Sequence, residues 1–367
     1  MRIPAANLKP SLEATRAVWR ANLEALDRKS HYILGEQVAS LEREFAAALG
    51  ARFAVGVGTG TAALELCLRD AGVTGRTQEV ITSALTSPFT GMAILSAGAS
   101  LRLADVDPET LLLDPDDVER RASRRTAAIV PVHLYGAPCD LGRFRRLARQ
   151  LGAALIQDAC QAHGARWHGR PLTAYSGYAA YSFYPTKNLG CLGDGGAILT
   201  NRASAAARLG TLRDGGRRKN EQVARVPAIN SRLDEMQACY LRAFLPRLDE
   251  WNARRARLAD LYDGALADCP GVRLLRRTAG SVHHLYVIRA TGRDRLREFL
   301  AGHGIGTGVH YPVPLHRMPA FRGRGLGRGD LPHAEKACRE VLSLPLWPYL
   351  AESQALEVAE RIRSYYR

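Results

Sequence analysis

The stretch SFYPTKNLGCLGDGGAI, residues 182–198, places one lysine between a Tyr-Pro-Thr sequence and a run of glycines. Its glycines permit turns with positive φ and close approach of the backbone to another group. A loop lysine is usually a solvated charge, and Lys187 taken alone is interpreted in that way. However, 46 of the 51 basic residues are arginines and only five are lysines. A neutral lysine amine is a nucleophile, whereas arginine cannot lose its proton. The use of lysine at position 187 of this arginine-rich chain therefore favours a chemical role for its amine.

The composition is that of a globular protein with two or three domain-sized units, or one large domain and a small one. The chain has 367 residues, of which 46% are hydrophobic and 24% charged. No run of about 18 apolar residues occurs, so we predict no membrane span, and the N-terminus lacks a signal-peptide pattern. The seven cysteines form no CxxC pair. This argues against a disulfide framework or a metal site and favours a reducing, cytoplasmic location.

The net charge of +15 raises the question of a nucleic-acid partner. The basic residues are spread along the chain, however, and no block of five or more occurs. We interpret most of them as solvated charges in a chain that favours arginine. A positive entrance for a phosphorylated small molecule is the functional alternative, and no nucleic-acid partner is predicted.

Apolar runs alternate with helical patterns through the first 200 residues. Helices are predicted at 60–72, 88–99 and 139–152, because their apolar residues follow the helical period. Short apolar runs between them predict strands at 51–58, 79–83, 101–106, 126–136, 153–159, 178–183 and 196–200. This order predicts an α/β fold with a mostly parallel sheet covered by helices on both faces.

The pattern changes from about residue 232. A long helical segment follows, with a kink or break expected at Pro246. A strand at 282–290 and a helix at 294–304 then indicate a smaller α+β unit, and the segment 323–332 is predicted to be a mobile loop. We predict a large domain at 1–245 and a small C-terminal domain at 246–367, with the N-terminal segment as a candidate to pack on the small domain.

A glycine-rich turn, GVGTGTAAL (56–64), leads from a predicted strand into a helix. Gly60 and Thr61 would lie at the helix N-terminus, where free N–H groups and the helix dipole favour a phosphate. The turn lacks the P-loop lysine and the GxGxxG spacing of dinucleotide sites. The alternative is a tight turn in which threonine only caps the helix.

A second group of polar residues, in IQDACQAHGA (156–165), follows another predicted strand. Asp158 ends the strand, where ligands of parallel sheets bind. Its carboxylate requires a cationic partner such as a protonated ring nitrogen, and a helix cap or a structural salt bridge is the alternative. Gln161 and His163 follow at the same edge, and His163 is retained as a catalytic candidate although a lone histidine is more often structural.

The phosphate turn, the strand-end Asp158 and Lys187 together match what pyridoxal phosphate requires. The lysine forms a Schiff base with this cofactor, the aspartate keeps the pyridine nitrogen protonated, and the helix N-terminus holds the phosphate. The three features are much more specific together than any one of them alone.

The chain resembles the DegT/DnrJ/EryC1/StrS family of sugar aminotransferases over almost its whole length. The resemblance rests on these motifs: YILGEQVASLEREFAA, GTGTAALEL, DVDPETLLLDP, PVHLYGAPCDL, QDACQAHGA, SFYPTKNLGCLGDGGAI, NSRLDEMQA and GVHYPVPLHRMPAF. It implies the type I pyridoxal-phosphate-dependent aminotransferase fold and transamination of a keto-sugar. Pyridoxamine phosphate would be the intermediate form of the cofactor. A relative with histidine in place of the lysine dehydrates sugars, so Lys187 favours transamination here.

The resemblance also implies roles for individual residues. Lys187 matches the Schiff-base lysine and Asp158 the partner of the pyridine nitrogen, while Gln161 would contact the 3-hydroxyl of the cofactor. Gly60, Thr61 and Ser182 would hold the phosphate. Asn230 matches a residue that reaches the phosphate from the neighbouring subunit, which implies a homodimer with shared active sites. Tyr32, His310, Tyr311 and His316 match substrate-binding segments, with aromatic packing and a Pro-rich turn as the alternative for the last three.

Four positions depart from the family pattern. Ser87 stands where an aromatic residue usually covers the cofactor ring, with Phe89 two residues later. Gln157 replaces an acidic residue, Cys160 an alanine, and His283 a tryptophan. The substitution at Ser87 leaves open what stacks on the ring and how large a substrate fits.

We predict a transaminase that uses glutamate or glutamine as amino donor and acts on a nucleotide-linked keto-sugar, with a preference for a 3-keto-deoxy sugar. The alternatives are a 4-keto nucleotide sugar and a cyclitol or other non-nucleotide ketone. A basic protein that keeps the fold without the activity is the alternative from another class; the intact set of Lys187, Asp158, Gly60 and Thr61 opposes it.

Overall fold

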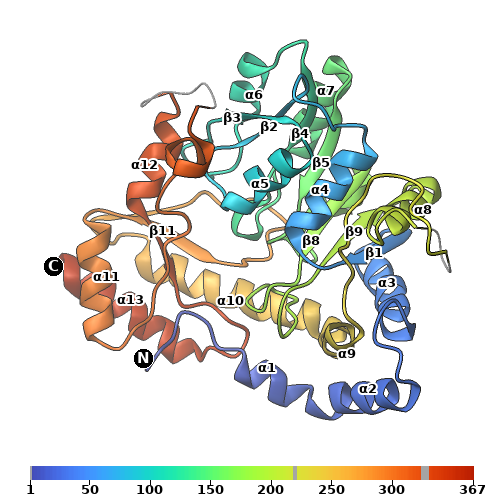
Figure 1. Ribbon diagram of the computed structural model, residues 1–367. Coiled ribbons are helices and arrows are strands. Elements are labelled where there is room, and N and C mark those ends of the chain that lie inside the picture. Colours follow the sequence, from blue (N-terminus) through green and yellow to red (C-terminus); the bar gives the residue numbers. More distant parts are fainter. Residues whose placement is uncertain (1, 218–220, 324–329) are drawn as a thin grey trace.

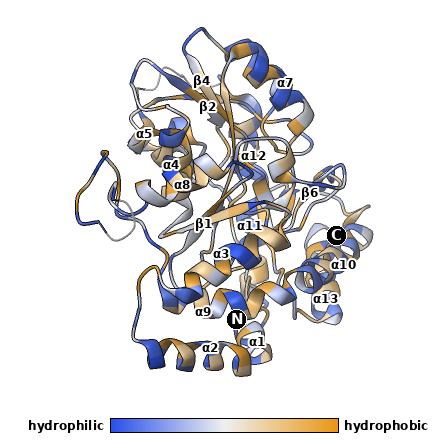
Figure 2. Ribbon diagram, turned by 90° about the vertical axis from the view of Figure 1, so that its right-hand side faces the viewer, coloured by the Kyte–Doolittle hydropathy of each residue, from blue (hydrophilic) through white to orange (hydrophobic). Residues whose placement is uncertain are grey.

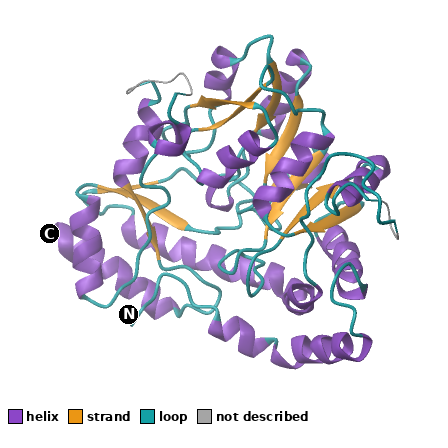
Figure 3. Cartoon of the chain, viewed as in Figure 1, coloured by secondary structure: helices purple, strands orange, loops and turns teal. Residues whose placement is uncertain are grey.

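A seven-stranded sheet forms the centre of the larger part of the molecule (Figures 1 and 3). This computed structural model describes residues 2–217, 221–323 and 330–367. The strand order in the sheet is β1-β9-β8-β5-β4-β2-β3. The strands are β1 (Phe53–Val57), β2 (Glu79–Ser83), β3 (Ser100–Ala104), β4 (Thr126–Val130), β5 (Ala154–Asp158), β8 (Tyr178–Ser182) and β9 (Gly196–Thr200).

Helices cover both faces of this sheet (Figure 3). They are α3 (Glu36–Ala48), α4 (Gly60–Asp70), α5 (Pro88–Ser96), α6 (Pro115–Arg121), α7 (Leu141–Leu151) and α8 (Ala203–Leu212). Alternate residues of β8 separate the two faces, because Tyr178 and Ala180 pack in the cluster that contains α4, whereas Ala179 and Tyr181 pack in the one that contains α3. Burial on both sides explains why the strands are nearly continuous apolar runs.

The sheet is mostly parallel, as predicted. The pairs β8–β5, β5–β4, β4–β2 and β2–β3 are parallel, and β9 alone of the seven runs antiparallel to its neighbours β1 and β8. The carboxyl ends of β1, β5 and β8 therefore lie at the same edge. Each of them leads into one of the predicted site segments.

Two helices connect the larger and the smaller part of the molecule (Figure 1). α9 (Glu235–Phe244) and α10 (Leu248–Leu266) are separated by the 3₁₀ turn η3 (Leu245–Arg247). This turn contains Pro246, which lacks an N–H and interrupts the helical hydrogen bonds, so the predicted break occurs there. The carboxylate of Glu235 accepts hydrogen bonds from the N–H groups of Gly35, Gln37 and Val38 at 2.8, 2.8 and 3.0 Å, which joins α9 to the start of α3.

The smaller part contains a three-stranded antiparallel sheet in the order β10-β11-β12. Its elements are β10 (Val272–Leu274), β11 (Tyr286–Ala290), β12 (Val341–Leu344), α11 (Arg293–Gly302), α12 (Pro332–Glu340) and α13 (Glu352–Tyr366). The N-terminal segment lies against it, since Ile3 is fully buried there and its N–H donates to Gly304 O at 3.0 Å. The domain boundary between residues 245 and 246 stays a prediction.

The remaining elements are short or peripheral. They are α1 (Lys9–Ala14), α2 (Arg16–Lys29), the hairpin of β6 (Arg166–Trp167) and β7 (Arg170–Pro171), and the turns η1 (Leu134–Gly136), η2 (Leu172–Ala174), η4 (Leu315–Arg317) and η5 (Pro319–Phe321). In Figure 2 the strands of the large sheet are mostly hydrophobic, whereas α7 carries hydrophilic residues on its exposed side. No helix in the described ranges is long and apolar enough to span a membrane. Most of the segment 323–332, predicted as a mobile loop, lies outside the described residues.

Two predicted strands are shorter in the structure, and residues with positive φ lie in the parts that are not extended. The strand predicted at 126–136 stops at Val130, and Tyr135 and Gly136 have φ of 61° and 92°. The strand predicted at 282–290 begins only at Tyr286, after His283 with φ of 46°. The two irregular segments contact each other instead, since the N–H of Val282 donates to Gly136 O at 3.0 Å.

Candidate active site

The glycine-rich turn lies beside the end of β8. Thr59 caps α4, because its hydroxyl accepts the N–H of Ala62 at 3.0 Å. The N–H groups of Gly60 and Thr61 at the helix N-terminus have no intrahelical acceptor. A side chain on Gly60 would place its Cβ 2.7 Å from Ser182 Cβ and 2.9 Å from Cys160 Sγ, so only glycine fits. The fold thus brings together the three residues predicted to hold the phosphate.

Asp158 ends β5 and is almost fully buried. Its Oδ1 accepts the N–H of Cys160 at 3.1 Å, and its Oδ2 accepts the hydroxyl of Thr90 at 2.8 Å. Thr86 Oγ1 lies 3.1 Å from Thr90 Oγ1. Because Thr90 gives its only hydroxyl proton to a carboxylate, it accepts from Thr86. A short chain of hydrogen bonds therefore runs from Thr86 through Thr90 to Asp158 and fixes the carboxylate.

The side-chain amide of Gln161 is held at both ends. Its Oε1 accepts the N–H of Tyr135 at 2.7 Å, and its Nε2 donates to the hydroxyl of Tyr311 at 3.1 Å. Burial raises the pKa of Tyr311 to about 12, and Ser87 is a further hydrogen-bond partner of its hydroxyl. The predicted cofactor contact Gln161 and the predicted substrate contact Tyr311 are thus neighbours, although 150 residues separate them in the sequence.

Lys187 is partly buried in the loop between β8 and β9. Burial lowers the pKa of its amine, and the nearby Cys160 and Asp158 act in the opposite direction. The charge of Lys187 in turn lowers the pKa of His163, His284 and His310, after the larger effect of their burial. Burial outweighs the opposing effect of Asp158 and Cys160, so the amine of Lys187 is easier to deprotonate than that of an exposed lysine.

These residues fit pyridoxal phosphate. The close approach at Gly60 leaves the helix N-terminus and Ser182 as donors for a phosphate, and Asp158 is a fixed carboxylate for a protonated ring nitrogen. Lys187, with its lowered pKa, offers an amine of the kind that reacts with the aldehyde carbon, and its role as the Schiff-base lysine stays a prediction.

The ring of His163 is fully buried among Phe45, Tyr181 and Phe183, with ring centroids 6.5, 5.3 and 6.0 Å away. Neither ring nitrogen has a hydrogen-bond partner in the described part of the chain, and burial lowers the pKa of the ring to about 3. The surroundings are those of a packed core side chain. A catalytic role for His163 stays a prediction.

The predicted substrate contacts lie in different surroundings. His310 is partly buried, and its Nδ1 lies 2.9 Å from Ser343 Oγ. His316 is buried, with Nε2 2.9 Å from Glu335 Oε1, so its imidazole contacts α12. Tyr32 is 46% exposed, and Asn230 is also exposed, beside Ser231, whose hydroxyl accepts the N–H of Gly58. Substrate contacts by these side chains, and a phosphate contact by Asn230, stay predictions.

Ser87 is polar at the position where the resemblance predicted an aromatic residue. Ser87 caps α5 by accepting the N–H of Phe89 at 3.4 Å, and Phe89 is 58% exposed. In the single chain Phe89 therefore does not take the place of the missing aromatic side chain.

Sequence reasoning missed several residues around the site. The predicted cofactor contacts Asp158 and Gln161 are oriented by Thr86, Thr90 and Tyr135. The side chain of Asn188, the residue after Lys187, contacts His284. Their partners are far away in the sequence, so a single chain carries no spacing signal for them. His133 was missed too: Cys139 N–H donates to its Nδ1, so its other nitrogen carries the proton and donates to Gln157 Oε1 at 2.8 Å.

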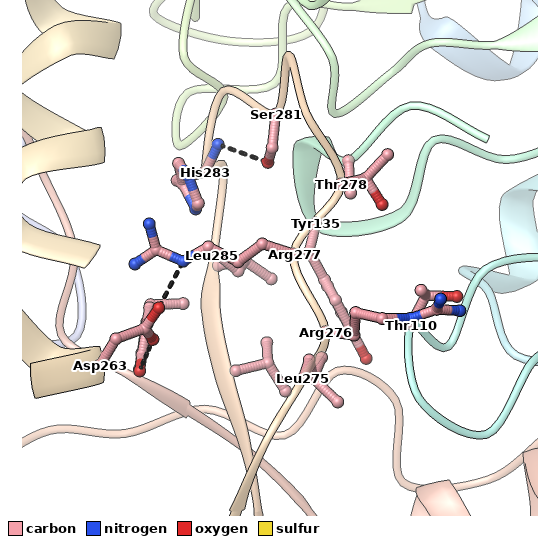
Figure 4. Close-up of a pocket in the computed structure, with 13 residues that line it drawn as sticks. Thr110, Tyr135, Asp263, Leu275, Arg276, Arg277, Thr278, Ser281, His283 and Leu285 are labelled. Carbon is pink, nitrogen blue, oxygen red and sulfur yellow. Dashed lines mark hydrogen bonds and ion pairs between the residues drawn. The ribbon is translucent and has the colours of Figure 1, made fainter. Parts of the chain in front are cut away.

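A further pocket is lined by Tyr135, by the connection between β10 and β11 and by Asp263 of α10 (Figure 4). Its two arginines are paired, Arg277 with Asp263 and Arg276 with Glu109. None of the predicted cofactor residues lines it. We interpret it as a cleft where the smaller part meets the larger one.

Comparisons with known proteins place these features in a family. The model of the DegT/DnrJ/EryC1/StrS aminotransferase family matches residues 15–363. The chain belongs to this family. It is a pyridoxal-phosphate-dependent aminotransferase, and the predicted family, fold, enzyme class and cofactor are confirmed.

Its similarity to individual members of the DegT/DnrJ/EryC1/StrS family extends over the whole chain. It is 43% identical to a dTDP-3-amino-3,4,6-trideoxy-alpha-D-glucose transaminase of Streptomyces venezuelae, covering 99% of this chain and 96% of that one. A UDP-2-acetamido-2-deoxy-3-oxo-D-glucuronate aminotransferase of Pseudomonas aeruginosa is 36% identical, over 90% and 91% of the two chains. The crystal structure of Streptomyces venezuelae DesV with a ketimine intermediate has a TM-score of 0.97 at 42% identity, covering 100% and 99%.

Proposed function

We propose that this chain transfers an amino group to the 3-keto carbon of a nucleotide-linked deoxy sugar, with glutamate or glutamine as donor. The proposal is carried by the similarity along the whole chain to two enzymes whose names place the reacting group at carbon 3. Lys187 supports transamination because its amine is available for the proton transfers of that reaction.

The bound cofactor supplies an aldehyde carbon for covalent attachment and a ring that accepts electrons. The N-terminus of α4 and Ser182 hold its phosphate, and Asp158, fixed by Thr90 and Cys160, keeps a proton on the ring nitrogen. Lys187 takes a proton from the donor carbon and later gives a proton to the sugar carbon. Its lowered pKa makes the neutral amine more available for this exchange than the amine of an exposed lysine.

Two alternatives concern the substrate. A 4-keto nucleotide sugar would use the same residues, because the amine and the ring nitrogen partner are unchanged. A cyclitol or other non-nucleotide ketone is favoured by one observation, the polar Ser87 at the position where relatives carry an aromatic side chain. Neither has the whole-chain similarity that supports the first proposal.

We also infer that the chain acts as a homodimer with shared active sites. Large apolar side chains are exposed near the site segments of the single chain, and they include Tyr32, Phe89, Tyr184 and Leu192. Burial of such side chains in a second copy would remove apolar surface from water. The exposed Asn230 next to the phosphate turn fits a contribution to the partner's site.

The substrate is tested with the enzyme converted to its pyridoxamine phosphate form. This form is mixed separately with a nucleotide-linked 3-ketone, a nucleotide-linked 4-ketone and a cyclitol ketone, and the return of the yellow absorbance is followed. We expect the fastest return with the nucleotide-linked 3-ketone. Return with the cyclitol ketone alone would overturn the proposal, whereas a faster return with the 4-ketone would correct only the position of the amino group.

A further inference from the structure

The residue that follows Lys187 is fixed by hydrogen bonds from two other segments. Asn188 is 3% exposed. Its Nδ2 donates to Asn252 Oδ1 and to Val282 O, both at 2.8 Å, and its Oδ1 lies 3.2 Å from Nδ1 of His284. Asn252 belongs to α10, and Val282 and His284 precede β11 in the smaller part of the molecule. The loop that contains Lys187 is thus attached to α10 and to the segment that precedes β11.

The chemistry of the partners fixes the direction of every bond. A backbone carbonyl only accepts, so the Asn188 atom that faces Val282 O is the amide nitrogen. Both protons of that nitrogen are used, and the amide oxygen therefore accepts from His284. Burial holds the pKa of His284 well below its ordinary value, so the ring is neutral and carries its single proton on Nδ1.

The same chain of bonds reaches the segment that follows Asp158. Asn252 Nδ2 donates to the backbone carbonyl of His163 at 2.9 Å. Gly164 is required for this contact, because its φ is +86° and a Cβ there would lie 2.9 Å from Asn252 Nδ2. The bonds run from His284 through Asn188 and Asn252 to the backbone of His163, and both side-chain amides along this path use their oxygen and their nitrogen in hydrogen bonds.

We propose that Asn188 and His284 are positioning residues that hold Lys187 in one place relative to Asp158 while its amine binds and releases the cofactor. An amine that is released in each half-reaction must return to the same carbon, and a displacement of about 1 Å costs on the order of a hundredfold in rate. Four rotatable bonds in the lysine side chain oppose this precision. A fixed backbone beside Lys187 restores the precise placement of the amine.

A second consequence concerns the environment of the amine. The groups around Lys187 are Asp158 and Cys160 at the end of β5, and the neutral rings of His163, His284 and His310. Burial keeps the pKa of Lys187 below that of an exposed lysine. Release of Asn188 would increase the contact of the amine with water, so its pKa would rise and less of it would be a nucleophile at neutral pH.

The test measures capture of pyridoxal phosphate by the apoprotein as a function of pH, from the growth of visible absorbance. The variants are Asn188→Ala, His284→Asn and His284→Gln. Asparagine carries its N–H near the place of the histidine Nδ1 and keeps the donor to Asn188, whereas glutamine carries it near the place of Nε2. Thr186→Ala is the matched control, because Thr186 is exposed on the other side of Lys187.

We expect Asn188→Ala and His284→Gln to slow capture about tenfold or more at pH 7.5 and to move the midpoint of the pH profile up toward that of a free lysine. His284→Asn and the control stay within about twofold of the wild type. Wild-type rates and midpoint in a folded Asn188→Ala variant would overturn the proposal, as would equal behaviour of the two His284 variants. If Asn188→Ala does not fold, the His284 pair decides.

This measurement needs neither a sugar nor an amino donor. The inference rests on pyridoxal phosphate chemistry alone, so its failure is distinguishable from a failure of the proposed substrate. A purely structural role of Asn188 would lower the unfolding temperature without moving the pH midpoint of capture, and that result would also contradict the proposal.

Discussion

At the scale of single residues, the site depends on groups that orient the predicted ones. Asp158 would be a carboxylate at the end of any similar strand, but here two hydrogen bonds fix both of its oxygens. Gln161 is likewise held by the N–H of Tyr135 and the hydroxyl of Tyr311. Orientation by such neighbours allows a charge partner to meet the cofactor without reorganisation.

We predict that Thr90→Val weakens cofactor binding, whereas Thr90→Ser does not. Valine has the shape of threonine but leaves Asp158 Oδ2 without its donor and Thr86 without its acceptor. Loss of a hydrogen bond to a charged group costs about 1.5–3 kcal/mol, which corresponds to a rise in the dissociation constant of roughly ten- to a hundredfold. Titration of the apoproteins with pyridoxal phosphate measures it. Equal binding by all three proteins would show that Thr90 does not support Asp158.

At the scale of helices and strands, the sequence predicted the seven strands of the large sheet and which of their ends carry chemistry. Gly60, Asp158 and Lys187 were recognisable because each follows an apolar run, and the carboxyl ends of strands in this sheet meet at one edge. The pairings between elements were not predictable in this way. Thr90 and Asp158 are 68 residues apart, and Asn188 and His284 are 96 apart.

The two shortened strands show a second limit of sequence reasoning. Apolar content predicted that 126–136 and 282–290 are extended throughout, but each segment contains a residue with positive φ, Tyr135 or His283, which a continuous strand does not accommodate. Tyrosine rarely adopts that conformation, and the two segments are joined by the hydrogen bond from the N–H of Val282 to Gly136 O. The reversed direction of β9 was not predictable either, because its apolar sequence resembles those of β1 and β8, to which it runs antiparallel.

Three histidine rings with lowered pKa values predict how the stability of the protein changes with pH. Burial lowers the pKa of His133 to about 4, and the pKa values of His283 and His310 are also about 4. These rings are neutral in the folded protein, whereas an unfolded histidine takes up a proton near pH 6.5. Their contribution to stability is therefore complete above about pH 6.5 and is lost as the pH falls toward 4, by about 1.4 kcal/mol per pH unit for each ring.

Urea unfolding of the wild type, followed between pH 7.5 and 4.5, measures this loss. We expect a smaller pH dependence in His133→Gln than in the wild type, because one buried titrating ring is removed. His168→Gln is the control, since His168 is exposed. An unfolding free energy that stays constant down to pH 5 in the wild type would contradict the prediction.

At the scale of the whole molecule, the single chain holds most of a site but leaves parts of it open. The phosphate turn, Asp158, Gln161 and Lys187 come together within one chain. Asn230 lies beside the phosphate turn with its side chain exposed, and Phe89 next to the site is 58% exposed. A second copy of the chain would cover such groups. The decisive question is whether Asn230 contributes to the site of its own subunit or to that of the partner.

Mixing the Lys187→Ala and Asn230→Ala variants tests which subunit's site contains Asn230. Lys187→Ala lacks the amine in its own site, and Asn230→Ala lacks the predicted phosphate contact, so we expect each variant alone to be strongly impaired. If Asn230 serves the partner's site, each mixed dimer contains one site with both residues and one site with neither. Random re-association of equal amounts then restores about one quarter of the wild-type sites. If Asn230 serves its own subunit, no site in a mixed dimer is complete and the mixture stays as impaired as its components. Unimpaired activity of Asn230→Ala alone would remove the residue from the site altogether.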